Sequence, residues 1–283
     1  MVPELIIEPG RAEKNYWRDL WHYRELFYFL AWRDILVRYK QTVIGIAWAV
    51  IRPLLTTVVF TFVFSRVAKL QAPGGVPYAL LVMAAMLPWQ FFSTSLSESS
   101  SSLISNSNLI SKVYFPRLIV PAGSIITSFV DFLITLALMA VLMLWYGFMP
   151  DWHLLFLPFY LALALGASFG VGLWLCALNV EYRDFRYIVP FIVQFGFFLS
   201  PVGYASDRVP EIWHWHGLDI PARLLYSFNP MVGVIDGFRW ALLRGQTDLW
   251  WPSVQLSVLL TSALCLSGIW YFRKMERTFA DVI

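Results

Sequence analysis

The chain has 283 residues, of which 59% are apolar, 18% are aromatic and only 14% are charged. An ordinary soluble domain carries about 25% charged residues, so this chain has too few charged side chains to cover a soluble surface of its size. The composition excludes a typical cytosolic enzyme and a disordered chain, and the net charge of only +3 excludes a nucleic-acid-binding protein.

Six stretches are predicted to span a membrane, because about 20 mostly apolar residues cross its hydrocarbon core. They are residues 43–65, 76–96, 118–146, 154–178, 187–204 and 254–272. We therefore predict an all-α integral membrane protein with a six-span domain over residues 43–283 and a cytoplasmic segment over residues 1–42. No cleavable signal is expected, since residues 1–19 contain no long apolar core.

Basic residues gather on one side of these spans. With the amino terminus placed inside, the inner segments hold 14 Lys and Arg residues and the outer segments hold six. Because the excess lies on the cytoplasmic side of a membrane, both termini are predicted to be cytoplasmic. The protein is expected in the inner (plasma) membrane, with several spans in contact with lipid.

The segment before the first span mixes aromatic and charged residues from Trp17 to Tyr39. This pattern predicts an amphipathic helix at the inner headgroup layer. The alternative is a solvated helix that packs on a soluble partner.

Residues 97–117, between the second and third spans, are predicted as a long loop rich in Ser and Asn. A residue at 106–108 would cap a short helix over residues 109–114, and Pro116 would end it. Such a helix on the cytoplasmic side suits the docking of a partner protein, and the alternative is a surface turn that only links two spans.

Two charged residues fall inside predicted spans, Arg52 in the first and Asp131 in the third. A charge in lipid costs from about 2.5 kcal/mol on insertion scales to more than about 10 kcal/mol in simulations. Each should therefore face an aqueous cavity, a lipid phosphate or an opposite charge, and pairing between the two is left open.

The link before the last span, residues 205–253, contains a break at Asn229-Pro230. Apolar side chains of residues 231–242 fall on one helical face. Residues 222–244 are predicted as a re-entrant helical hairpin in the outer leaflet. Because non-helical backbone at that depth needs protein or water around it, the hairpin should lie near a pore.

Several chemical motifs are absent from the sequence. It contains no Gly-Lys pair and hence no phosphate-binding P-loop, and no HExxH, CxxC or GxSxG motif. His214 and His216 are interpreted as part of an interfacial Trp/His cluster, and Cys176 and Cys265 as small packing residues in apolar runs. No cofactor or metal is therefore predicted for this chain.

Several segments resemble one known family in order and spacing. They are RDILVRYKQTVIGIAWAVIRPL at 33–54, SNLISKVYFPRLIVP at 107–121, NVEYRDFRYIVP at 179–190, and SPVGYA with FNP at 200–205 and 228–230. The chain resembles the membrane subunit of a polysaccharide-exporting ABC transporter, of the Wzm-like O-antigen, capsule or teichoic-acid permease group.

The resemblance implies a homodimer that works with two copies of an ABC ATPase subunit, which would bind ATP and Mg²⁺. The substrate would be a lipid-linked polysaccharide. The segment at 107–117 resembles a coupling helix that contacts the ATPase, and the charged turn near 181–186 resembles a second contact. The residues assigned to this coupling are Asn108, Leu109, Ile110, Lys112, Tyr114, Phe115, Arg117, Glu181, Arg183, Asp184 and Arg186. The amino-terminal helix resembles the family's interface helix, and the hairpin around Asn229 and Pro230 resembles helices that narrow the outer mouth.

A sugar polymer presents hydroxyl groups and flat C–H faces, which aromatic rings can cover. Rings that share a helical face in the fifth and first spans are therefore predicted to line a pore. They are Tyr187, Phe191, Phe195, Phe198, Phe60 and Phe64. The alternative is that these rings pack against lipid or neighbouring helices.

Three rival functions are open at this point. An ABC exporter of the same fold would move a drug or a small lipid. A membrane-bound glycan transferase would need clustered carboxylates or a basic cluster, and the outer carboxylates are scattered. An ion-driven transporter would favour several acidic residues at the midplane, where only Asp131 is found.

Overall fold

The computed structural model describes residues 16–40, 45–182, 184–215 and 218–279. The predicted residues 1–15, 41–44, Arg183 and His216 lie outside this part. The α-helices, in chain order, are α1 (Tyr16–His22), α2 (Arg24–Lys40), α3 (Gly45–Phe60), α4 (Tyr78–Ser105), α5 (Ser107–Ile110), α6 (Ile119–Trp145), α7 (Leu157–Glu181), α8 (Phe185–Phe198), α9 (Ala222–Tyr226), α10 (Pro230–Leu242) and α11 (Trp251–Met275). Shorter turns are the π-helix η2 (Thr61–Val67), which continues α3, and the 3₁₀-helices η3 (Pro73–Gly75), η4 (Trp152–Phe156) and η5 (Ser206–Arg208).

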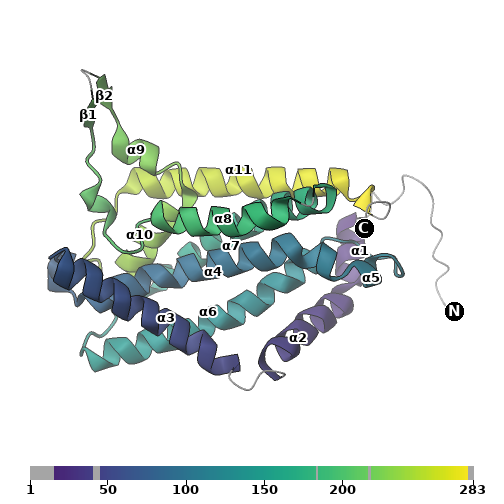
Figure 1. Ribbon diagram of the computed structural model, residues 1–283, viewed down its shortest axis with the longest axis horizontal. Helices are drawn as coiled ribbons and strands as arrows, with labels where there is room; N and C mark the ends of the chain where they lie inside the picture. Colours follow the sequence, from purple (N-terminus) through teal and green to yellow (C-terminus); the bar gives the residue numbers. More distant parts are fainter. Residues whose placement is uncertain (1–15, 41–44, 183, 216–217, 280–283) are drawn as a thin grey trace.

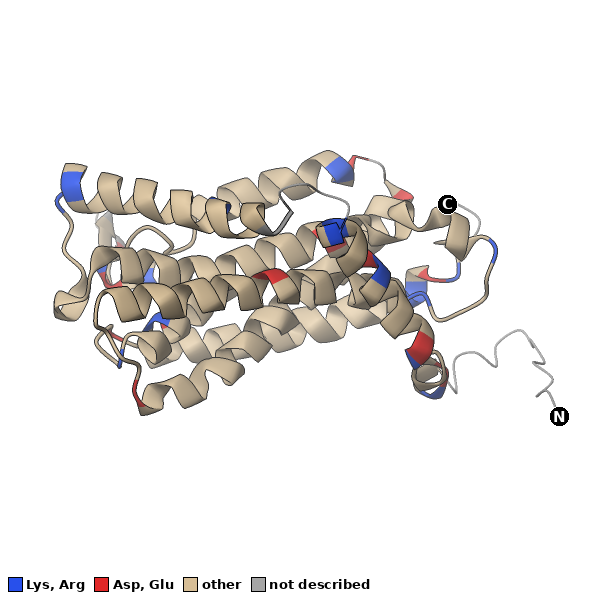
Figure 2. Cartoon of the chain, turned by 90° about the horizontal axis from the view of Figure 1, so that it is seen from below, with Lys and Arg blue, Asp and Glu red and all other residues tan. Residues whose placement is uncertain are grey.

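The long helices form an elongated bundle (Figure 1). One end, the α5 end, carries α1, α5 and the last turns of α11, and the opposite end, the α9 end, carries α9 and the strands. Charged residues gather at both ends and are sparse between them (Figure 2). This distribution is what a protein that crosses a hydrocarbon layer requires.

Five helical segments are long and apolar enough to cross a membrane, which supports most of the predicted spans. They are Ala47–Val67, Tyr78–Ser105, Ile119–Trp145, Trp152–Glu181 and Trp251–Met275. The predicted fifth span, residues 187–204, is only partly helical, because α8 has 14 residues and covers about 21 Å. Ser200-Pro201 explains its early end, since proline has no N–H donor and disfavours the α conformation in the residue before it.

A small antiparallel hairpin stands out from the α9 end of the bundle (Figure 1). Its strands are β1 (Trp213–Trp215) and β2 (Leu218–Ile220), and their register places His214 opposite Asp219. The His214 Nδ1 atom lies 2.6 Å from Asp219 Oδ1. No strands were predicted from the sequence, so the all-α class holds for the bundle but not for this hairpin.

The second predicted span is part of a longer helix. α4 has 28 residues, and most of them are buried, including Ser95, Ser99 and Ser102. Helix α4 packs against α6, α7 and α10 and therefore forms the centre of the bundle. The prediction of a loop that starts at residue 97 is wrong, because the Ser-rich stretch continues α4 to Ser105.

Several serine hydroxyls of α4 find a partner within the helix, although the buried hydroxyls of Ser95 and Ser99 have none in the described part of the chain. Ser97 Oγ donates to Ser93 O at 2.8 Å, and Ser101 Oγ donates to Ser97 O at 3.0 Å. Small side chains also let α4 approach α7 closely, since a Cβ atom on Gly172 would lie 2.8 Å from Ser99 Oγ. This is the small-residue packing typical of helices in membranes.

Helices α7 and α11 also meet at glycine. A Cβ atom on Gly170 would lie 2.6 Å from Cys265 N, and one on Gly268 would lie 2.4 Å from Gly170 O. Because these neighbours are backbone atoms, they cannot rotate out of the way. The two helices therefore keep their spacing only while both positions lack a side chain.

Gly170→Ala is expected to destabilise the protein by about 1–3 kcal/mol, since overpacking forces the helices apart. The measurement is thermal unfolding of the purified protein in detergent. Gly123→Ala is the matched control, because Gly123 is also helical and its nearest new contacts would be 3.9 Å away. An equal loss of stability in both variants would contradict the close α7–α11 contact.

Candidate functional site

The predicted coupling segment is mostly a turn rather than a helix. Only α5 (Ser107–Ile110) is helical, so the expected helix over residues 109–114 is wrong. Asn106 does not cap α5 with its side chain. Its Nδ2 atom instead donates to Ser102 O at 2.9 Å, and its Oδ1 atom accepts a hydrogen bond from Arg33 Nη2 at 2.8 Å. The carboxamide thereby joins the end of α4 to α2.

Burial divides the predicted coupling residues of this segment into two groups. Asn108, Lys112 and Tyr114 are exposed, and Leu109 is half-buried. Ile110 and Phe115 are buried, in a cluster that also contains Leu103, Leu118 and Phe272. The buried pair therefore holds the segment against the bundle, and the exposed residues form its free surface.

Arg117 connects the same segment to the chain beyond α11. Its backbone N–H donates to Glu276 Oε1 at 2.7 Å, and its Nη1 donates to Glu276 O at 2.5 Å. Burial raises the pKa of the Glu276 carboxyl above its ordinary value, although the Arg117 N–H opposes this shift. Glu276 was not predicted from the sequence, because it lies 159 positions from Arg117 along the chain.

The second predicted coupling segment joins α7 to α8. Glu181 ends α7, and Asp184 and Arg186 stand at the start of α8. All three are exposed. This segment lies at the α5 end of the bundle, as α5 does (Figure 1).

The two charges predicted inside spans do not pair with each other. Asp131 Oδ2 lies 3.1 Å from Arg38 Nη2, and the Tyr39 hydroxyl donates to Asp131 Oδ1. Arg38 Nη1 also lies 3.4 Å from Glu98 Oε1 on α4. In the part of the chain that the structure describes, Arg52 makes no ion pair and its side chain is exposed.

The aromatic rings predicted to line a pore occupy two environments. Tyr187, Phe191, Phe195 and Phe198 are all at least half exposed on α8. Phe60 and Phe64 are half-buried instead, and Phe60 packs edge-on against Phe197 of α8 with ring centroids 5.3 Å apart. The structure thus brings the outer parts of α3 and α8 together and leaves one face of α8 uncovered.

The predicted break at Asn229-Pro230 is present. Asn229 caps α10, since its Oδ1 atom accepts a hydrogen bond from Met231 N at 3.0 Å, and Pro230 occupies the first turn. The helix that follows is buried on nearly all sides against α4, α7 and α11. Protein therefore surrounds α10.

Arg239 on α10 was not identified as a site residue. It is only 1% exposed, and its guanidinium donates to three backbone carbonyls: Leu81 O at 3.1 Å, Val202 O at 2.9 Å and Tyr204 O at 2.8 Å. Asp236, one turn earlier, is also buried. An Asp and an Arg three positions apart in an apolar helix are the signal that could have revealed this site.

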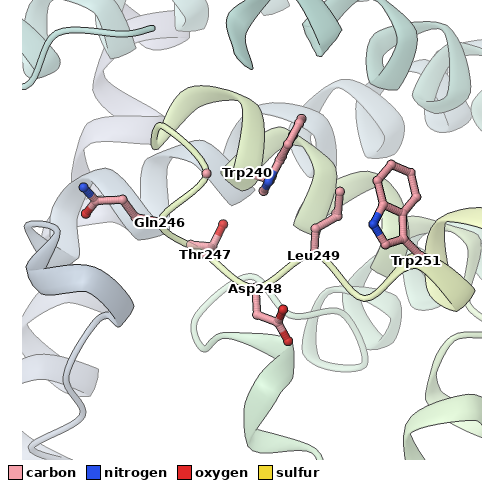
Figure 3. A pocket seen from close by; sticks show the side chains of 7 residues that line it. Trp240, Gln246, Thr247, Asp248, Leu249 and Trp251 are labelled. Atoms are coloured by element: carbon pink, nitrogen blue, oxygen red, sulfur yellow. The ribbon is translucent and has the colours of Figure 1, made fainter. Parts of the chain in front are cut away.

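A shallow hollow of about 480 Å³ lies at the α9 end, between α10 and α11 (Figure 3). It is lined by two indoles, one leucine and several small or polar residues: Trp240, Gly245, Gln246, Thr247, Asp248, Leu249 and Trp251. It is open to the surface and contains none of the predicted site residues.

Comparison with known proteins shows which protein family the chain belongs to. A family model for the ABC-2 type transporter matches residues 25–243, which is most of the chain. The chain belongs to this ABC-2 transporter family. The match runs from α2 to the end of α10 and includes the predicted coupling segment, α8 and the α9–α10 break. The chain is therefore a membrane-embedded transport subunit and not an enzyme.

Curated relatives point the same way. Two proteins of Klebsiella pneumoniae named "O-antigen export system permease protein RfbA" are each 28% identical, over 255 and 257 residues, and each alignment covers 89% of this chain and 92% of the relative. A protein of the same name from Myxococcus xanthus is 28% identical over 222 residues, which are 78% of this chain and 82% of the relative. The family resemblance noted in the sequence is confirmed.

Proposed function

We propose that this chain is the transmembrane subunit of an ATP-driven exporter that moves a lipid-linked polysaccharide, of O-antigen or capsule type, across the inner membrane. The observation that carries the proposal is the similarity to O-antigen export permeases along 89% of the chain. A separate ABC ATPase would supply the energy, and ATP and Mg²⁺ would bind to that partner. The absence of a P-loop motif from this sequence supports the division of labour.

The exporter would contain two copies of this chain with two ATPase subunits. The uncovered aromatic face of α8 is available to a second copy of this chain. In the dimer, α8 would be the sixth membrane helix, and its four exposed rings, with Phe60 and Phe64, would line the path of the polymer.

The α5 end would face the cytoplasm, with both termini on that side, because the segments that end there hold the excess of basic residues. Helices α1 and α2 would lie at the inner headgroup layer as the interface helix. Their exposed aromatic residues support this position, including Trp17, Trp21 and Phe29.

The ATPase would contact the exposed coupling residues, namely Asn108, Lys112, Tyr114, Glu181, Asp184 and Arg186. Leu109 would contribute its half-exposed side chain, whereas Ile110, Phe115 and Arg117 would position the segment from within. At the α9 end, α9 and α10, joined at Asn229-Pro230, would form a re-entrant pair that narrows the outer mouth. Closure of the ATPase on ATP would move the helices as rigid bodies.

The test is purification of the tagged chain from its native cells in mild detergent. An ABC ATPase should co-purify in equal amount, and vesicles rebuilt from the complex should move a lipid-linked glycan only with ATP. Transport of small lipids or drugs but not of the glycan would favour the rival exporter. Purification without any ATPase would contradict the proposal.

A further inference from the structure

The turn that follows α8, residues 199–204, is held by side chains from three other elements; we name it the outer turn. Arg239 on α10 donates to the carbonyls of Val202 and Tyr204. Tyr78, the first residue of α4, donates its hydroxyl to Gly203 O at 2.7 Å. Three successive carbonyls of the outer turn therefore accept hydrogen bonds from side chains.

The short segment between α9 and α10 binds the same turn from the other side. Asn229 Nδ2 donates to Ser200 Oγ at 2.9 Å and lies 3.4 Å from Leu199 O. The hydroxyl of Tyr226, at the end of α9, lies 2.9 Å from that of Tyr204. Both halves of the re-entrant pair and the break between them are thus attached to the end of α8.

Packing removes the remaining freedom of the outer turn. Val202 is fully buried. A Cβ atom on Gly203 would lie 2.4 Å from the Phe64 ring and 2.8 Å from the Phe60 ring. Close contact with these two rings therefore requires glycine at this position. Through this contact the outer turn packs against α3 and η2.

Arg239 is the residue that makes separation costly. Its planar guanidinium carries five donors in a fixed fork, which one side chain can aim at three carbonyls. Hydrogen bonds from a charged group are about twice as strong as neutral ones. If α10 moved away from the outer turn, a buried charge and buried carbonyls would lose their partners together.

We propose that the outer turn joins α8, α9 and α10, together with the start of α4, into one rigid body, with Arg239 as its positioning residue. The outer mouth then opens when the re-entrant pair moves together with α8, and not when the pair parts from α8. This inference rests on the proposed function, in which α8 lines the path and α9–α10 narrow its mouth.

A reversible cross-link between Ser200 and Asn229 tests the inference, because these side chains are in contact. The variant Ser200→Cys/Asn229→Cys is made in a chain in which Cys176 and Cys265 are replaced by Ala. Export is compared between the oxidised and the reduced form of the same complex, so effects of the substitutions themselves cancel. For a rigid body, the oxidised form should export at about half the rate of the reduced form or faster. A lower rate would show that the pair must part from α8 and would overturn the inference.

Export by the parent chain without cysteines distinguishes a failure of this inference from a failure of the proposed function. If the parent does not export the glycan, the proposed function fails, whereas a cross-link effect concerns only the rigid body. Arg239 provides a second measurement that does not depend on the cysteine pair.

Arg239→Met should lower the glycan exported per ATP hydrolysed by about tenfold, and Arg239→Lys should restore part of it, because Lys keeps the charge but not the fork. A purely structural role would instead lower the amount of assembled complex and leave export per ATP unchanged. That outcome would overturn the assignment of Arg239.

Discussion

Simultaneous replacement of Leu109 and Tyr114 by alanine is expected to lower glycan export per ATP hydrolysed by about tenfold or more, since each lost contact in the centre of an interface costs about 1–2 kcal/mol. Tyr114 is 57% exposed and therefore free to insert into a partner. The measurement combines ATP hydrolysis and export in the same vesicles, together with the amount of bound ATPase.

The neighbouring residue gives the matched control. Phe115 is only 4% exposed, so Phe115→Ala should cost about 3–5 kcal/mol of folding stability through the cavity it leaves. The complex that still assembles with this variant should keep its coupling. Full coupling in the Leu109→Ala/Tyr114→Ala chain would contradict a docking role for this segment.

Arg52→Ala is expected to lower export without lowering insertion. Loss of the charge removes an insertion cost of about 2.5–3.5 kcal/mol, so the amount of inserted protein should rise or stay level. Export should nevertheless fall about tenfold, because an arginine inside a span, exposed and without an ion pair in the described chain, needs a polar group on a partner, a lipid or the substrate.

Two variants check the cause of this effect. Arg52→Lys keeps the charge and should retain part of the export. Arg244→Ala removes an exposed arginine at the α9 end, where its guanidinium lies 5.6 Å from the Phe148 ring, and should export normally. Equal export by Arg52→Ala and Arg244→Ala at matched expression would contradict a role for Arg52.

The positions of the long helices were predictable where hydrophobicity alone determines them. Residues 118–146 and 254–272 became α6 (Ile119–Trp145) and α11 (Trp251–Met275), because the thickness of the hydrocarbon core sets the length of an apolar helix. The break at Asn229-Pro230 was also predictable, since asparagine before proline is a strong local signal.

Features that depend on distant partners were not predictable. The serines after residue 97 were predicted as a loop because serine is polar, and their burial depends on distant neighbours such as α7, which approaches Ser99 closely at Gly172. Asp131 was identified, but its partners Arg38 and Tyr39 were assigned to a surface helix. Likewise, nothing local to Arg239 reveals the carbonyls of Val202 and Tyr204.

The central position of α4 has a consequence for how the protein is made. Among the five long apolar segments, α4 has the lowest hydropathy, 1.4, and the largest buried share, 83%. Helix α4 also precedes α6, α7 and α10 in the chain, so the helices that bury its serines are synthesised after it. Correct folding of α4 therefore depends on α6, α7 and α10, which are synthesised after it.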